Sequence, residues 1–227
     1  MIILTGASGG IGQQIIKPLS KFDNIIGIYN LTKPKIDLKN VSFIKIDLLK
    51  EIEILKLIKK IGSSKEKITL INCAGVKKDN LIINQPYKEW KSIIDLNLNT
   101  SFLLSKHLLK KMILNQWGRV SFISSSGARD GDLGTGAYSS SKTGLIGLSK
   151  VISKEYGKYN ITSNIIELGA FDTGMYKKLN QKIKNKIIKK IPSDKLGQKE
   201  DIINTIKFII DTSFMNGSVV KIDGGAD

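Results

Sequence analysis

Several residue types are scarce in this sequence, and each shortage excludes a class of site. Among 227 residues there is one cysteine, Cys73, and one histidine, His107. A single cysteine excludes a disulfide within the chain and any cysteine cluster for a metal ion. A single histidine excludes sites that need several, and we expect His107 to be structural because it lies in an amphipathic helical pattern over residues 102–112. We therefore expect no metal site.

Long apolar runs are also missing. No stretch approaches the roughly 20 apolar residues that a membrane-spanning helix needs. Met1 leads directly into a strand pattern, which leaves no room for a signal peptide. These absences predict a cytoplasmic protein with no membrane partner.

Arginine is rare although the chain is strongly basic. The net charge is +16, yet only Arg119 and Arg129 of the 36 basic residues are arginines. Nucleic-acid sites favour clustered arginine and stacking aromatic side chains, whereas here the lysines are spread over the helices and aromatic residues make up 7% of the chain. The charge therefore indicates a compositional bias on solvated faces and non-specific attraction to anions, not a specific nucleic-acid partner.

The elements that are present alternate between strand and helix patterns. Strands are predicted at residues 1–4, 24–29, 41–46, 67–71, 120–123, 161–167 and 218–222, and helices follow most of them. This alternation predicts one α/β domain over residues 1–227, a doubly wound Rossmann fold with a seven-stranded parallel sheet in the order 3-2-1-4-5-6-7 and helices on both faces.

Two connections depart from this pattern. Residues 31–40 show no helical run, although a parallel crossover usually contains a helix. Residues 176–190 carry seven lysines, at 177, 178, 182, 184, 186, 189 and 190. We expect a mobile substrate lid at about residues 172–195 that could receive an anionic substrate or an acidic carrier protein, with a merely solvated lysine face as the alternative.

A glycine-rich loop follows the first strand. Gly6, Gly10 and Gly12 lack the Cβ atoms that would hold a pyrophosphate away, and Ser8 and Ile11 lie between them. The helix that begins there offers free N–H groups and the positive end of its dipole. The strand, loop and helix context favours a dinucleotide site over a purely structural turn.

The end of the second strand bears on the choice of cofactor. An NAD-selective site places a carboxylate about 20 residues after the loop, where this chain has Tyr29 and Asn30. Asn30, Thr32 and Lys33 could bind a 2′-phosphate, so we expect NADP in preference to NAD. Asp47 and Leu48, after the third strand, are placed to meet adenine, although Asp47 could equally cap the helix over residues 51–60.

A tyrosine and a lysine supply the candidate chemistry. Tyr138 and Lys142 are four residues apart in a helical pattern and therefore share one face. A nearby lysine stabilises a phenolate, which lets a tyrosine exchange protons with a substrate oxygen. The same spacing begins at Tyr29 and Tyr87, so spacing alone proves nothing. Only Tyr138 follows a strand that ends in serines, where Ser125 could donate a hydrogen bond to the same oxygen.

Small and polar residues mark two further positions. Asn72, Ala74 and Gly75 follow the fourth strand, where a cofactor could pass close to the backbone. Asn97 interrupts a helical stretch and indicates a distortion that exposes a backbone carbonyl, or else an ordinary polar position between two helices.

Together these motifs resemble the short-chain dehydrogenases/reductases, among them the 3-oxoacyl-carrier-protein reductases. The corresponding residues run in order along the chain: Thr5, Gly6, Gly10, Ile11, Gly12, Asp47, Asn72, Ala74, Gly75, Asn97, Ser125, Tyr138, Lys142, Gly169, Thr173 and 223–225. Cys73 and Leu168 depart from the family pattern, which usually has asparagine and proline there.

The resemblance implies NAD(P)(H)-dependent hydride transfer between nicotinamide and a carbonyl or alcohol substrate. It assigns Tyr138 as the acid/base, Ser125 as the group polarising the substrate oxygen, Lys142 as the residue that lowers the tyrosine pKa and binds ribose, and Asn97 as the holder of a linking water. A 3-oxoacyl thioester on a carrier protein and a sugar or polyol are candidate substrates. A non-catalytic nucleotide sensor or scaffold is the rival function. The resemblance also implies a homodimer or homotetramer through the helices at 100–115 and 136–157.

Overall fold

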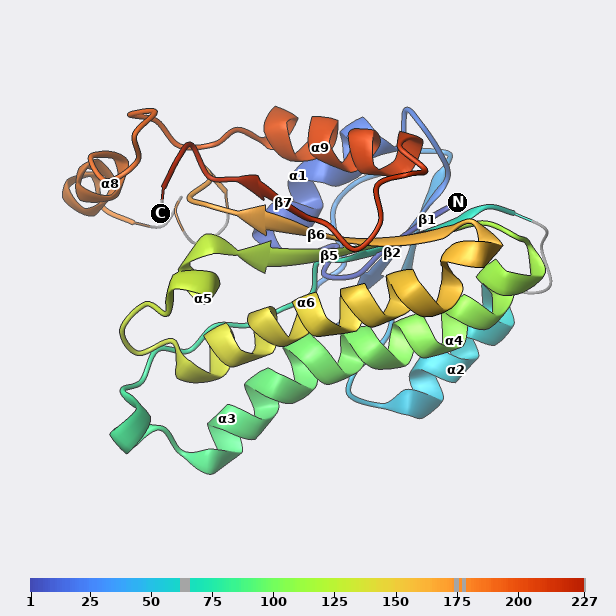
Figure 1. Ribbon diagram of the computed structural model, residues 1–227, viewed down its shortest axis with the longest axis horizontal. Helices are drawn as coiled ribbons and strands as arrows, with labels where there is room; N and C mark the ends of the chain where they lie inside the picture. The colour runs from blue at the N-terminus through green and yellow to red at the C-terminus, as the bar shows by residue number, and fades with distance from the viewer. Residues whose placement is uncertain (62–65, 174–175, 177–178, 227) are drawn as a thin grey trace.

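A single parallel sheet is the centre of the fold. In this computed structural model, which describes residues 1–61, 66–173, 176 and 179–226, seven parallel strands pair in the order β3-β2-β1-β4-β5-β6-β7 (Figure 1). Their bounds are β1 Ile2–Leu4, β2 Ile25–Tyr29, β3 Val41–Lys45, β4 Ile68–Asn72, β5 Gly118–Ser125, β6 Ile161–Leu168 and β7 Val219–Ile222. The predicted fold and strand order are confirmed.

Helices cover both faces of the sheet (Figure 1). The helices α1 Gly10–Leu19 and α9 Lys199–Asp211 pack on one face, and α2 Glu51–Ile61, α4 Thr100–Leu114 and α6 Gly136–Tyr156 pack on the other. Strand side chains alternate between these layers: Ile2 and Leu4 join the α1 and α9 layer, while Ile3 joins the opposite one. Two buried cores therefore fix the register of the central strands.

The helix before β5 is distorted where Asn97 was expected to disturb it. The helix α3 Tyr87–Ile94 continues through a π-helical turn, Asp95–Asn99, into α4. The carbonyl of Asn97 accepts a 3.1 Å hydrogen bond from the Ser101 hydroxyl, and the Asn97 side chain is fully buried. A π turn inserts an extra residue into the helix, which turns this side chain into the protein interior.

The connections between strands show what the sequence pattern missed. The link over residues 31–40 has no helix, as predicted. Two short helices were not predicted: α5 Ser126–Asp130, directly after β5, and α8 Gln181–Ile188, inside the expected lid. In Figure 1 α8 projects beyond the edge of the sheet at which β5 and β6 end. Residues 174, 175, 177 and 178 of the lid lie outside the described residues.

Among the helices that the structure describes, none combines the length and the apolar character needed to cross a bilayer.

Candidate active site

A cavity of about 640 Å³ opens at the carboxyl ends of β1, β4, β5 and β6. In open parallel sheets the ligand-binding crevice lies outside the carboxyl ends of the strands, at the point where the strand order reverses. That point here falls between β1 and β4. The predicted site residues that line the cavity are Gly10, Ile11, Gly12, Gly75, Ser125, Tyr138, Lys142, Gly169 and Thr173.

The glycines of this loop have two different roles: some allow close packing of the backbone, and others leave room for a ligand. Gly6 has a φ of 66°, and a Cβ there would lie 2.8 Å from the main-chain nitrogen of Ala74. A Cβ on Gly12 would collide with the carbonyl oxygen of Gly6. These two glycines therefore serve close backbone packing, whereas Gly9 and Gly10 are exposed at the cavity. Gly9, which was not among the predicted binding residues, is the N-cap residue of α1.

The start of α1 fits an anionic group. No side chain in the part of the chain that the structure describes caps it, and its first turn contains no acidic residue. The N–H groups of the first turn of a helix have no partner within the helix, and the helix dipole adds partial positive charge there. A dinucleotide pyrophosphate could be bound by these N–H groups, because Gly9 and Gly10 leave its approach open.

Thr5 joins the glycine loop to the end of β4. Its buried hydroxyl oxygen accepts hydrogen bonds of 3.0 Å from the N–H groups of both Cys73 and Ala74. Ala74 thereby stays against Gly6, and Cys73 lines the cavity. Burial raises the pKa of the Cys73 thiol to about 11, so this thiol stays protonated and unreactive at neutral pH.

Lys142 is buried at the inner end of the cavity. Its ammonium group donates a 2.6 Å hydrogen bond to the carbonyl oxygen of Ile123, and burial lowers its pKa from 10.5 to about 8. It lies 6.0 Å from the centre of the Tyr138 ring. The helix α6 therefore does place the tyrosine and the lysine side by side, next to β5.

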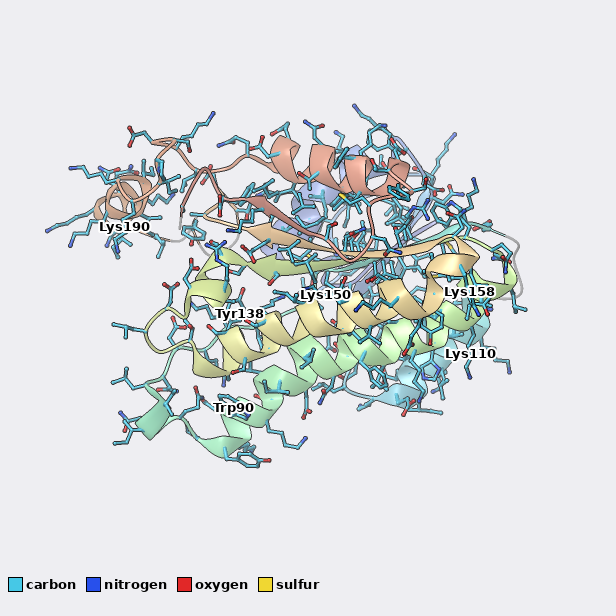
Figure 2. The ribbon with its side chains drawn as sticks, viewed as in Figure 1. Trp90, Lys110, Tyr138, Lys150, Lys158 and Lys190 are labelled. Carbon is cyan, nitrogen blue, oxygen red and sulfur yellow. The ribbon has the colours of Figure 1, made fainter. Side chains whose placement is uncertain are left out.

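The pKa of Tyr138 differs from the expectation that Lys142 lowers it. Burial raises this pKa above 10.0, and the hydrogen-bonded Ser125 side chain opposes the shift only in part. The reason is that burial of the phenol penalises its charged form, and this desolvation is the largest effect on its pKa. In this structure the phenol is a weak acid that keeps its proton at neutral pH. Figure 2 shows Tyr138 at the end of α6 nearest the carboxyl edge of the sheet.

The Asn97 side chain is hydrogen-bonded to two segments beside the cavity. Its Oδ1 accepts a hydrogen bond of 2.9 Å from the N–H of Val76, and its Nδ2 donates bonds of 3.0 Å to the Val76 carbonyl and the Ser141 hydroxyl. A Cβ on Gly75 would lie 3.3 Å from Asn97 Oδ1 and 3.4 Å from Lys142 Nζ. Asn97 is therefore a neighbour of Lys142, while its part in a water relay stays a prediction.

The predicted adenosine side is less enclosed. Asn30 is exposed after β2, and Ser8 accepts a 2.8 Å bond from the Gln13 side chain through its carbonyl. Asp47 Oδ1 accepts the N–H of Leu49, in the turn that leads into α2, so this carboxylate already binds the backbone just before the helix. The Leu48 side chain is buried in the core. Their roles toward a cofactor stay predictions.

The far wall of the cavity comes from β6 and the lid. A Cβ on Gly169 would lie 2.6 Å from the Cα of Asp223, so only glycine fits between these segments. Thr173 is buried at the base of the lid. Asn72, at the end of β4, is buried and its Nδ2 has no partner in the part of the chain that the structure describes.

The substrate half of the cavity is lined by residues that no motif singled out: Val76, Lys77, Asp130, Asp132, Tyr176, Ile187 and Lys190. Val76 and Lys77 were missed altogether, whereas Tyr176, Ile187 and Lys190 fall within the lid expected at about residues 172–195, and Asp130 and Asp132 fall within residues 127–135, where substrate choice was also expected. No family motif covers Val76 and Lys77, so only their nearness to the motif at Gly75 could have indicated them. Among residues 1–61, 66–173, 176 and 179–226, no group of three or more acidic, histidine or cysteine side chains could hold a metal ion.

Comparisons with known proteins agree with this geometry. The family model for short chain dehydrogenase matches residues 1–184. The chain is 35% identical over 233 residues to the 3-oxoacyl-[acyl-carrier-protein] reductase FabG of Buchnera aphidicola subsp. Baizongia pistaciae, covering 98% of this chain and 95% of the relative. It is 30% identical to the protein of that name from Aquifex aeolicus, with the same coverage.

A solved structure shares the fold. It is a protein from Agrobacterium tumefaciens proposed to be a gluconate dehydrogenase, with a TM-score of 0.91, 22% identity, and coverage of 100% of this chain and 95% of the other. The chain belongs to the short-chain dehydrogenase family. It is a nicotinamide-dependent oxidoreductase that acts on carbonyl or alcohol groups.

Proposed function

We propose that this protein is an NADP-dependent reductase of 3-oxoacyl thioesters carried on an acyl carrier protein. The observation that carries the proposal is the similarity, over nearly the whole chain, to relatives with that name at 30–35% identity. The lysine-rich lid supports an acidic carrier, since Lys190 lines the cavity and Figure 2 places it at the end of the molecule where α8 projects.

The site suits proton donation to a carbonyl. Tyr138 keeps its proton at neutral pH because burial raises its pKa, and it is hydrogen-bonded to Ser125. A substrate carbonyl oxygen between these hydroxyls would accept a hydrogen bond from each. When bound, the nicotinamide supplies the hydride that reaches the carbonyl carbon. As negative charge develops on the oxygen, Tyr138 transfers its proton to it, and the positive charge of Lys142 stabilises the phenolate that remains.

The residues that follow β2 support the choice of NADP. Asn30 and Lys33 are exposed there, and no acidic residue occupies the position that would repel a 2′-phosphate. An exposed lysine attracts a phosphate, and an asparagine amide can donate a hydrogen bond to it.

Self-association is part of the proposal. Phe102 on α4 and Val151 on α6 are about half exposed, at 48% and 50%, on the helix layer away from α1 and α9. Burying such side chains against a second copy stabilises a dimer. Light scattering after size-exclusion chromatography measures the oligomer size, and a strictly monomeric protein would contradict this part.

A direct assay tests the function. The purified protein is supplied with NADPH or NADH and with 3-oxobutanoyl thioesters of coenzyme A and of acyl carrier protein, beside ketones and sugars. We expect the highest kcat/KM for the carrier-bound thioester with NADPH. A sugar or polyol oxidised with higher kcat/KM would replace the proposal, and nucleotide binding without any turnover would indicate a sensor.

A further inference from the structure

The substrate half of the cavity contains two carboxylates with different surroundings. Asp130 is neutralised by Arg129, whose Nε and Nη2 lie 2.6 and 3.1 Å from its two oxygens. Arg129 also binds the buried carboxylate of Glu167 at 2.7 Å. Asp132 is different, because its carboxylate has no hydrogen bond or ion pair with any residue that the structure describes.

The Asp132 carboxylate occupies the space that a side chain at Gly127 would fill. A Cβ on Gly127 would collide with Oδ2 of Asp132, and it would lie 3.9 Å from Oγ of Ser125. The aspartate oxygen and the serine hydroxyl therefore flank one glycine. Any larger residue at position 127 would force the carboxylate away from the serine.

The backbone around Asp132 is held on both sides. Its N–H donates a 3.1 Å bond to the carbonyl of Gly127, and its own carbonyl accepts bonds from the N–H and hydroxyl of Thr135 at 3.1 and 2.7 Å. Burial raises the pKa of Tyr176, and the nearby Asp132 carboxylate raises it further, so this carboxylate lies near a residue of the lid. On a chain of net charge +16, an unpaired negative group thus lies between the lid and Ser125.

We propose that Asp132 determines substrate specificity by accepting a hydrogen bond from an uncharged donor near the reacting carbonyl. The inference rests on the proposed function, since it takes Ser125 and Tyr138 as the pair that binds the carbonyl oxygen. An ionised carboxylate accepts hydrogen bonds and donates none, so it selects hydroxyl or amide N–H groups. The same charge repels an anionic group on the substrate and disfavours free 3-oxo acids.

Two substrate classes present such a donor. A 3-oxoacyl thioester of a pantetheine arm has an amide N–H beyond its sulfur, and a sugar or polyol has a hydroxyl beside the carbonyl. Each class has a simple matched pair. The 3-oxobutanoyl thioester of N-acetylcysteamine has the amide, and its S-ethyl counterpart lacks it. Hydroxyacetone has the hydroxyl, and butanone lacks it.

The experiment compares kcat/KM within each pair for the wild type, Asp132→Ala and Asp132→Asn. We expect the wild type to prefer the donor-bearing member of one pair at least about 10-fold, and that pair identifies the source of the donor. Asp132→Ala should reduce this preference to within about twofold. Asp132→Asn, which keeps an acceptor oxygen, should retain part of it and should increase activity on 3-oxobutanoate.

The matched control is Asp211→Ala, which removes another exposed carboxylate, at the end of α9 and outside the cavity. Its preference should equal that of the wild type, and thermal unfolding and NADPH binding check that each variant is folded. The inference would be overturned if the wild type shows no preference in either pair, or if Asp132→Ala shows the same preference as the wild type. Either result would leave the proposed function standing. A wild type that reduces no carbonyl compound would overturn the proposed function, and the inference with it.

Discussion

Lys142 donates a 2.6 Å hydrogen bond to the main-chain carbonyl oxygen of Ile123, two residues before Ser125 on β5. The bond ties α6, which carries Tyr138, to the strand that carries Ser125. Because both ends are buried, the distance between the two hydroxyl groups depends on a lysine whose pKa burial lowers to about 8.

The free energy of unfolding should therefore depend on pH through Lys142. The unfolded lysine titrates near 10.5 and the folded one near 8, so below pH 8 both are protonated and the folded state carries the full cost of the buried charge. As pH rises from 8 to 10.5 the folded amine loses its proton first and that cost disappears. Relative to Lys142→Met, the wild type should gain up to about 3 kcal/mol over this range.

Urea unfolding at pH 7, 8, 9 and 10 measures this difference. The lost hydrogen bond to Ile123 adds an offset that does not change with pH, so the slope is decisive. Lys150→Met is the control, because Lys150 is exposed on the same helix (Figure 2). Parallel pH curves for the wild type and Lys142→Met would contradict the prediction.

Tyr138→Phe should separate catalysis from nucleotide binding. The variant lacks only the hydroxyl that gives up a proton, so kcat should fall by about 10²- to 10⁴-fold. The cofactor affinity should change little, since the glycine loop and Lys142 are intact. Single-turnover rates and titration of NADPH fluorescence measure the two quantities. A variant with unchanged turnover would favour another acid, and Tyr87→Phe, an exposed tyrosine on α3, serves as the control.

The sheet could be predicted because its strands are buried apolar runs that end in small or polar residues. The catalytic motif could be predicted because Ser125, Tyr138 and Lys142 keep a recognisable order and spacing. Two helices could not. The helix α5 is only five residues long. The helix α8 is eight residues long and lysine-rich, and although Ile183 and Ile187 share one face, none of its residues is buried, so its apolar stripe is too short to stand out from the surrounding lysines.

The substrate half of the cavity could not be predicted for a different reason. Asp132 and Lys77 both line it but come from separate connections, and only the folded chain brings them to one cavity. The direction in which the pKa of Tyr138 shifts also could not be predicted from the sequence. This direction depends on how deeply the phenol is buried and on its hydrogen bond with Ser125, neither of which residue spacing gives.

Asn30→Asp should shift cofactor preference from NADPH toward NADH. A carboxylate at this exposed position after β2 would repel a 2′-phosphate and accept hydrogen bonds from the ribose hydroxyls instead. The kcat/KM for NADPH should fall at least about 10-fold, which corresponds to roughly 1.4 kcal/mol, while that for NADH should rise. Lys33→Gln should weaken NADPH alone, by a few-fold. Equal losses with both cofactors in Asn30→Asp would argue that Asn30 is not near the ribose.

Arg119 makes contacts that a lysine could not reproduce. At the start of β5 its Nε donates a 3.0 Å bond to the carbonyl of Ile210, and its Nη1 donates bonds of 2.8 and 2.9 Å to the carbonyls of Gly118 and Asn160. Its guanidinium also lies 4.5 Å from the centre of the Trp117 ring. A lysine has one nitrogen and no planar group, so it cannot reach these carbonyls and stack at once.

Arg119→Lys should consequently destabilise the fold without changing the chemistry. At least one buried carbonyl would lose its partner, which lowers the free energy of unfolding by about 2 kcal/mol. The side chain lies at the amino end of β5, opposite the cavity, so kcat should stay within about twofold of the wild type at 25 °C. Urea unfolding and steady-state kinetics on the same preparation measure both quantities. If Arg119→Lys unfolds at the same urea concentration as the wild type, the guanidinium bonds contribute no net stability, and the retention of arginine here has no structural cause.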